Sequence, residues 1–400
     1  MKIFLLMVNL KTENGNKDIK TEKNVDKEDI SVFLSKKGFL KADNPHEVSQ
    51  SKIRNNVPQI TSEKLIDLKL KGNHKIKYSS SGRFLMMSNN KSLSSFDTKK
   101  LNLMFDREIE NCTEMTFLHD ETFLATVQKF KKSIKSLKGS DSESCVYIYD
   151  KIGREQHHLT NHKNAEFLTF LPYHFLLASS STDNFLRWTD VCSGKTVAEK
   201  YVKEGITAFN HEPSTALLFS GTNKGTISTF SPSQKDFHTK ILAHKNQIKS
   251  INFYKNFMVA SNEDSVKIFD SRNYYEPVAQ FNPGIFNNIA VSKTGKIAVA
   301  IKNRIKIYNE NKLEMVQKVD RKVHSIEFQP FEDILTVGSD GIYSLLVPGA
   351  GDPNYDTFED NPFITKKQRQ AREVTKLLEK IPYELIGVNI ADSLVEEEDK

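Results

Sequence analysis

A short strand-like segment that ends in an aromatic residue recurs along this chain of 400 residues. The repeated segments read SLSSFD, CVYIYD, FLRWT, TISTFS, SVKIFD, RIKIYN and IYSLLV. The aromatic positions are Phe96, Tyr149, Trp188, Phe230, Phe269 and Tyr308, and Leu346 takes the corresponding place in the last segment. Successive positions lie 53, 39, 42, 39, 39 and 38 residues apart. A regular period near forty indicates that one structural unit is repeated, and seven marks predict seven units.

The fifth unit shows the whole pattern. Four apolar runs are separated by polar turns, at 248–253, 257–261, 266–270 and 277–281. Four strands in a period near forty are typical of a WD-repeat blade. We therefore predict an all-β fold, a seven-bladed WD-repeat β-propeller over residues 64–348. An N-terminal polar arm over 1–63 and a C-terminal basic, amphipathic helical tail over 349–400 complete the predicted domains.

A histidine and an aspartate recur at matching places in the better preserved units. His244 precedes the first strand of the fifth unit, and Asp264 lies in the turn before its third strand. His162 and Asp183 repeat this arrangement in the third unit. Because the pair follows the repeat, we predict a hydrogen bond within the blade rather than a catalytic pair.

The last unit lacks a fourth strand, because Pro348 and two glycines follow Leu346. The segment KLIDLKL at 64–70 alternates apolar and polar residues and precedes the first unit. We predict that it pairs with the last blade and closes the ring, which removes the exposed sheet edges. Deletion of residues 1–70, but not of 1–60, should then destabilise the propeller.

The first sixty residues have a different character. Residues 9–60 are rich in Lys, Asn, Asp and Glu, a composition that predicts an extended arm that orders only on a partner. Ser31–Leu40 is an apolar island and a candidate anchor. The apolar run Ile3–Val8 is shorter than the core of a signal peptide, so a partner-binding or packing role is favoured over targeting.

The formal net charge is +6, and much of it is concentrated in one insertion. The long first spacing places a basic loop between the second and third strands of the second unit. Its lysines are Lys129, Lys131, Lys132, Lys135 and Lys138. Such a cluster predicts a mobile loop that binds RNA phosphates, and the alternative is a loop expansion without function.

The tail contains a predicted helix that follows an Asn-Pro turn at 361–362. One helical face carries apolar residues, namely Val374, Leu377, Leu378 and Ile381. A neighbouring region is basic, with Lys366, Lys367, Arg369, Arg372, Lys376 and Lys380. Pro382 should end the helix. We predict a docking helix that binds RNA or a partner protein, and the alternative is a surface helix packed on its own domain.

Sequence signatures of catalysis are absent. No HExxH, Walker or GxSxG motif occurs, and the three cysteines form no CxxC pair. We therefore predict no enzymatic activity, no cofactor and no metal site. The cysteine pattern fits a reducing compartment, and no apolar run approaches the length of a membrane span.

The segment VPGAGDPNYDTFEDNPFITKKQRQAREVTKLLEKIPYELI, at 347–386, closely resembles the tail signature of one family. This is the U3 small nucleolar RNA-associated protein 7 family, whose tail is known as the BING4 C-terminal domain. The segments FLPYHFLLAS at 170–179 and FQPFEDILTVG at 328–338 are also similar to it. The resemblance extends from about Val32 to the tail, whereas the lysine loop departs from the family pattern.

The resemblance implies a non-catalytic scaffold of the small-subunit processome, acting in small-subunit ribosomal RNA precursor processing. The implied partners are other processome proteins including neighbouring propellers, precursor ribosomal RNA and the U3 small nucleolar RNA particle. Neither a membrane nor a small-molecule substrate is implied, and the location would be the nucleolus in the nucleus. The alternative is a WD-repeat adaptor in a non-ribosomal complex, such as a ubiquitin ligase or vesicle coat.

Overall fold

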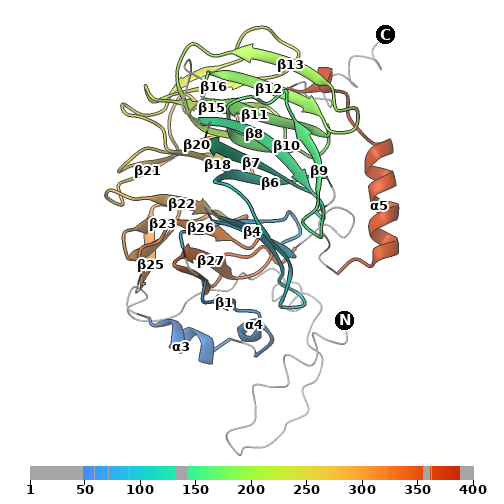
Figure 1. The fold of residues 1–400 in the computed structure, drawn as a ribbon. Coiled ribbons are helices and arrows are strands. Elements are labelled where there is room, and N and C mark those ends of the chain that lie inside the picture. Colours follow the sequence, from blue (N-terminus) through green and yellow to red (C-terminus); the bar gives the residue numbers. More distant parts are fainter. Residues whose placement is uncertain are drawn as a thin grey trace, which may run out of the picture. The chain divides into compact units, whose positions relative to one another are not determined.

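The structure is a computed structural model, which describes residues 48–57, 59–70, 72–89, 91–119, 121–131, 142–319, 321–354, 361 and 363–387. These residues form seven four-stranded antiparallel sheets, the blades of a β-propeller (Figure 1). The predicted fold class is therefore confirmed. The segments expected at Ile3–Val8 and Ser31–Leu40 lie outside the described residues.

Each of the first six blades is built from four consecutive strands. Blade one holds β2 (Lys75–Tyr78), β3 (Phe84–Ser88), β4 (Ser92–Asp97) and β5 (Asn102–Glu108). Blade two holds β6 (Cys112–Phe117), β7 (Leu124–Lys131), β8 (Ser142–Tyr149) and β9 (Glu155–Leu159). Blade three holds β10 (Ala165–Leu171), β11 (Leu176–Ser181), β12 (Phe185–Asp190) and β13 (Thr196–Tyr201).

The remaining blades follow in chain order. Blade four holds β14 (Ile206–His211), β15 (Leu218–Thr222), β16 (Thr226–Phe230) and β17 (Lys240–Leu242). Blade five holds β18 (Ser250–Tyr254), β19 (Phe257–Ser261), β20 (Val266–Asp270) and β21 (Ala279–Phe281). Blade six holds β22 (Asn288–Val291), β23 (Lys296–Ile301), β24 (Arg304–Asn309) and β25 (Lys312–Lys318). Blade seven holds β26 (Ser325–Phe328), β27 (Ile334–Ser339), β28 (Gly341–Leu346) and the distant β1 (Asp67–Leu68).

The repeated aromatic positions lie at the ends of the third strands and are buried. Trp188 in β12 is fully buried, and Tyr149 and Phe269 are each 2% exposed. Trp188 belongs to an apolar cluster that joins blade three to Leu218 and Phe230 of blade four. Burial of an aromatic side chain between neighbouring blades removes a large apolar area from water. The periodic sequence mark is therefore the contact that holds adjacent blades together.

His162 has the predicted structural role, although with other partners. Its Nδ1 lies 2.6 Å from Oγ of Ser179, and its Nε2 lies 2.8 Å from Oγ1 of Thr189. Burial and nearby Arg187 lower the pKa of His162 to about 4, so the ring is neutral at pH 7. Asp183 instead accepts a hydrogen bond from Asn164, so the predicted histidine–aspartate bond is wrong here.

His244 shows the same departure. Its Nε2 is 3.1 Å from the carbonyl oxygen of Ala260, and its Nδ1 is 3.2 Å from Oγ of Ser265. Asp264 donates its backbone N–H to the side chain of Asn262 and lies in an exposed turn. Hydroxyl and carbonyl groups within the blade therefore satisfy the polar atoms of this buried ring.

The ring closes as the sequence predicts. Strand β1 pairs antiparallel with β28, with Asp67 opposite Tyr343 and Leu68 opposite Ile342. Ile66, just before β1, is 5% exposed, and its carbonyl oxygen accepts the backbone N–H of Ser344 at 2.9 Å. The outer strand of the last blade thus comes from the other end of the propeller sequence.

Part of the predicted arm is folded against the ring. Helix α3 (Gln50–Asn55) buries Ile53, which is 3% exposed and packs in a cluster with residues of blades six and seven. The side chain of Gln50 bonds to both backbone groups of Leu346, at 2.9 and 3.1 Å. A second short helix, α4 (Gln59–Glu63), leads to β1. The expectation of an extended arm over 9–60 is therefore wrong for 48–57, and deletion of 1–60 should also destabilise the ring.

Candidate functional site

The tail forms helix α5 (Lys366–Leu378), which begins with a capping box. The hydroxyl of Thr365 accepts the backbone N–H of Gln368, and the amide oxygen of Gln368 accepts the backbone N–H of Thr365 at 2.9 Å. These bonds satisfy two backbone donors at the helix start, which the TKKQ sequence provides. The helix ends at Leu378, before Pro382, and the short 3-10 helix η2 (Tyr383–Leu385) follows.

The first half of α5 contacts blades one and two. The guanidinium carbon of Arg369 lies 5.9 Å from the ring centre of Phe84. The carboxylate of Glu373 lies 3.5 Å from Nε2 of His119. Phe363, just before the helix, places its ring 4.7 Å from the ammonium group of Lys99. These contacts fix the start of the helix over the turns at one face of the ring.

The end of the helix is joined to blade three by polar contacts. The ammonium group of Lys380 lies 2.8 Å from Oδ2 of Asp190. Burial alone would raise the pKa of Asp190, but hydrogen bonds from Lys380 and the N–H of Cys192 hold it below the usual value. Ile381 donates its N–H to the carbonyl oxygen of Tyr173 at 3.0 Å. The ion pair is therefore formed at neutral pH, and the helix is held at both ends.

The residues after the helix are anchored in the core. Ile386 is 2% exposed and packs in the apolar cluster of blades three and four. Gly387 donates its N–H to the carbonyl oxygen of Thr215 at 3.3 Å. The carbonyl oxygen of Ile381 also accepts a hydrogen bond from Nδ1 of His174, at 3.0 Å. One side of α5 therefore packs on the propeller, as expected for the alternative of a surface helix packed on its own domain.

The opposite side of α5 presents apolar side chains to solvent. We call Val374, Leu377 and Leu378 the outer apolar strip, and they are 57%, 42% and 83% exposed. Ile381 was predicted on the same face, but it is half-buried against blade three. Because α5 ends at Leu378, Ile381 no longer follows the helical spacing. Three of the four predicted apolar residues remain open to a partner.

The basic residues of the tail do not share one environment. Lys367 is exposed, whereas the side chain of Lys366 lies outside the described residues. Arg369 is half-buried against blade one, and Lys380 is paired with Asp190. Arg372 and Lys376, the remaining two basic residues, line a cavity under the helix. The docking of α5 therefore divides the predicted basic face.

The cavity between α5 and the ring has a volume of about 1010 Å³. Arg372 and Lys376 line its helix side, and Lys293 lines it from blade six. Glu327 of blade seven also lines it, and burial raises the pKa of this carboxyl to about 7. The cavity wall therefore combines cations with a carboxyl that is partly neutral at pH 7.

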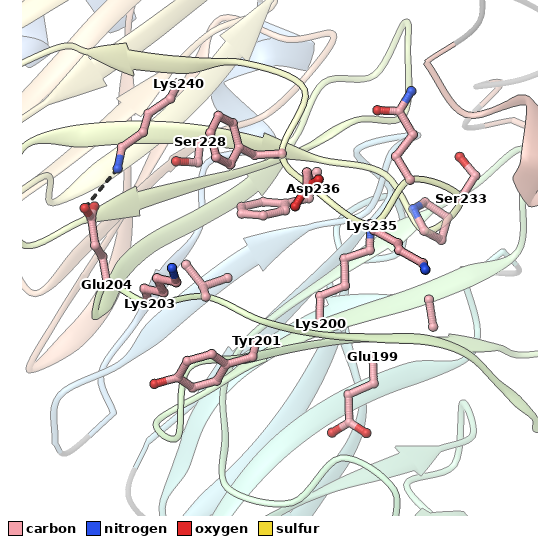
Figure 2. Close-up of a pocket in the computed structure, with 16 residues that line it drawn as sticks. Glu199, Lys200, Tyr201, Lys203, Glu204, Ser228, Ser233, Lys235, Asp236 and Lys240 are labelled. Atoms are coloured by element: carbon pink, nitrogen blue, oxygen red, sulfur yellow. Dashed lines mark hydrogen bonds and ion pairs between the residues drawn. The ribbon is translucent and has the colours of Figure 1, made fainter.

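A second hollow lies between blades three and four (Figure 2). This groove, of about 610 Å³, is lined by residues 198–204, by 232–237 and by parts of β16 and β17. We call it the lysine groove, after Lys200, Lys203, Lys235 and Lys240. No local sequence pattern indicates this groove, because its lysines are scattered over about forty residues and meet only through the blade topology.

The predicted lysine loop is only partly described. Lys129 and the backbone of Lys131 belong to β7, so the strand extends further than predicted. Lys132, Lys135 and Lys138 lie outside the described residues.

Within the described part of the chain, no helix is long and apolar enough to cross a membrane. The same residues contain no group of three or more His, Cys, Asp or Glu side chains placed to hold a metal ion.

Solved structures share the propeller fold. The β-propeller domain of Cps50 (Swd1) from Myceliophteria thermophila has a TM-score of 0.59 at 13% identity, and the similarity covers 71% of this chain and 99% of that one. Raptor from Chaetomium thermophilum has a TM-score of 0.58 at 10% identity, covering 72% of this chain and 29% of that one. At such low identity these similarities establish the fold alone.

Curated relatives match most of the chain. WD repeat-containing protein 46 of Caenorhabditis elegans is 33% identical over 362 residues, covering 87% of this chain and 60% of the relative. The human protein of that name is 33% identical, covering 89% and 60%. U3 small nucleolar RNA-associated protein 7 of Saccharomyces cerevisiae is 34% identical over 388 residues, covering 88% and 68%.

The chain thus spans about 60% of the length of the worm and human relatives and 68% of the yeast relative. Residues 313–389 match the family described as the BING4CT (NUC141) domain. This match runs from β25 through blade seven to the end of the docked tail. The chain therefore belongs to the family of WD repeat-containing protein 46 and U3 small nucleolar RNA-associated protein 7.

Proposed function

We propose that this protein is a non-catalytic scaffold of the small-subunit processome, acting in small-subunit ribosomal RNA precursor processing and ribosome biogenesis. The observation that carries the proposal is the family match, which includes a yeast relative named for association with U3 small nucleolar RNA. The BING4CT match covers the docked tail and not only the repeats. A location in the nucleolus follows from this role.

The outer apolar strip is the proposed protein-binding site. Propellers are shared by proteins of many functions, so the ring alone does not specify this one. Val374 and Leu378 expose most of their surface on a helix that is held at both ends. Because the helix is already ordered, a partner need not supply the free energy to fold it. Each apolar side chain contributes about 1.5–3 kcal/mol if fully buried.

The basic tail residues are proposed as a second set of contacts. Lys366 and Lys367 lie at the helix start, where they can meet RNA phosphate or an acidic protein surface. Arg369 and Lys380 serve first to hold α5 on the ring. Arg372 and Lys376 line the cavity beneath α5, where an anionic group could join them.

Co-purification tests the proposed role directly. We expect the tagged full-length chain to precipitate U3 small nucleolar RNA and precursor ribosomal RNA, and to sediment with large particles. A propeller adaptor of a ubiquitin ligase or vesicle coat would instead recover those complexes without precursor RNA. Recovery of neither RNA above the level of an unrelated tagged propeller would refute the processome assignment.

The lysine loop is proposed as an RNA contact of the second blade. Substitution of Lys129, Lys131, Lys132, Lys135 and Lys138 by Ser should leave the melting temperature unchanged and weaken single-stranded RNA binding at low salt. Each lost phosphate contact should reduce the slope of log affinity against log salt by roughly 0.7. Fluorescence anisotropy over a salt series measures this slope. An unchanged slope would support a loop expansion without function.

A further inference from the structure

The lysine groove has an excess of positive charge that its own acids do not balance. Glu199 pairs with Arg187 at 2.8 Å, and Glu204 pairs with Lys240 at 2.9 Å. Four lysines line the groove against three acids, the third of which is Asp236. The groove lining therefore keeps a small excess of positive charge.

Two of the groove lysines are available for an anionic ligand. Lys203 and Lys235 are exposed and form no ion pair within the part of the chain that the structure describes. Lys200, in contrast, donates to the carbonyl oxygen of Ser231 and lies 5.6 Å from the ring centre of Trp188. Two aromatic rings also line the groove, those of Tyr201 and Phe237. Their side chains are 60% and 51% exposed. The groove can therefore accept a ligand that is both acidic and apolar.

The described tail reaches the edge of this groove. Gly387 has a φ of +84°, a conformation that favours glycine, and a Cβ atom there would lie 3.6 Å from Cε1 of His238. His238 immediately follows the groove residue Phe237. The Nε2 atom of His238 is buried and has no hydrogen-bond partner in the described part of the chain. The chain thus passes a buried, unsatisfied polar atom as it arrives at the groove.

The sequence beyond Gly387 has the matching chemistry. Residues 388–400 read VNIADSLVEEEDK, with five acids, one lysine and the apolar residues Val388, Ile390, Leu394 and Val395. Thirteen residues span about 43 Å when extended, so the segment is long enough to follow the groove. We propose that residues 388–400 bind in the lysine groove, with their carboxylates at Lys203 and Lys235 and their apolar residues against the exposed rings.

Chemical coupling in the full-length chain tests the placement. A zero-length carbodiimide joins a carboxylate to a lysine only when the two are in contact. We expect mass spectrometry to find Glu396, Glu397 or Glu398 joined to Lys203 or Lys235. Links distributed over lysines across the ring, with no preference for the groove, would overturn the proposal. A groove that links only to an added acidic peptide would also overturn it and assign the site to a partner.

Proteolysis measures the strength of the contact. We expect a glutamate-specific protease to cut at 396–398 about fivefold faster when Lys203→Gln and Lys235→Gln are combined, as expected for two surface ion pairs. The matched control combines Lys312→Gln with Lys318→Gln, two exposed lysines of β25. High salt should accelerate cleavage of the unmodified chain, because it screens surface charges. Equal cleavage of the groove variant and the control would refute the contact.

Discussion

Removal of residues 1–70 is expected to lower the melting temperature of the propeller by about 10 °C or more, whereas removal of 1–47 should leave it unchanged. The larger deletion removes two buried isoleucines, Ile53 and Ile66, which are 3% and 5% exposed. Loss of each side chain from the core lowers the free energy of unfolding by about 2–5 kcal/mol, as for other large-to-small changes in a core. It also removes β1 and leaves the edge of β28 unpaired.

Point variants separate the two contributions. Ile53→Ala tests helix α3 and Ile66→Ala tests the segment at β1, and each should reduce the free energy of unfolding in the full-length chain. Lys52→Ala is the matched control, because Lys52 is exposed on the same short helix as Ile53. Thermal unfolding followed by circular dichroism measures all variants. If the chain lacking 1–70 has the same melting temperature as the chain lacking 1–47, the stability of the ring does not depend on this closure.

The repeat made the fold predictable because one contact is used seven times. A buried residue at the end of each third strand, such as Trp188 or Phe269, must recur with the blade. Helix α3 escaped prediction for the opposite reason. It spans six residues with a single buried side chain, Ile53, and one apolar residue establishes no period.

The tail was predictable only in part. The helix and its apolar residues follow from spacing along one segment, so local sequence was sufficient to predict them. Its docking depends on Phe84, His119 and Asp190, which lie in three different blades. Such contacts are set by the ring topology and leave no local pattern. The lysine groove was missed for the same reason.

Substitution of the outer apolar strip is expected to have the largest effect on function. Val374→Asp combined with Leu378→Asp places two charges on a surface that we propose is buried by a partner. Loss of two such apolar contacts should weaken association at least tenfold. Both side chains are mostly exposed, so the two substitutions together should change the stability of the free protein by no more than about 1 kcal/mol.

Truncation after Gly351 is a less specific test than these substitutions. It removes Ile386 from the core of blades three and four and breaks the pair of Lys380 with Asp190. A defect of the truncated chain could therefore not be assigned to lost binding alone, because the truncation also alters the surface of the ring. Charge reversal at Lys366 and Lys367 should give a weaker defect that is largest at low salt and shrinks as salt is raised, if these residues contact RNA.

The most direct measurement is gradient sedimentation of tagged, full-length variants, read by the fraction that travels with precursor ribosomal RNA. The matched control combines Val278→Asp with Ile285→Asp, two apolar residues of blade five and its exit loop that are 63% and 77% exposed. We expect the control to sediment like the unmodified protein and the strip variant to remain in the light fractions. Full co-sedimentation of the folded strip variant would contradict the role of α5 as the element that joins this propeller to its particle.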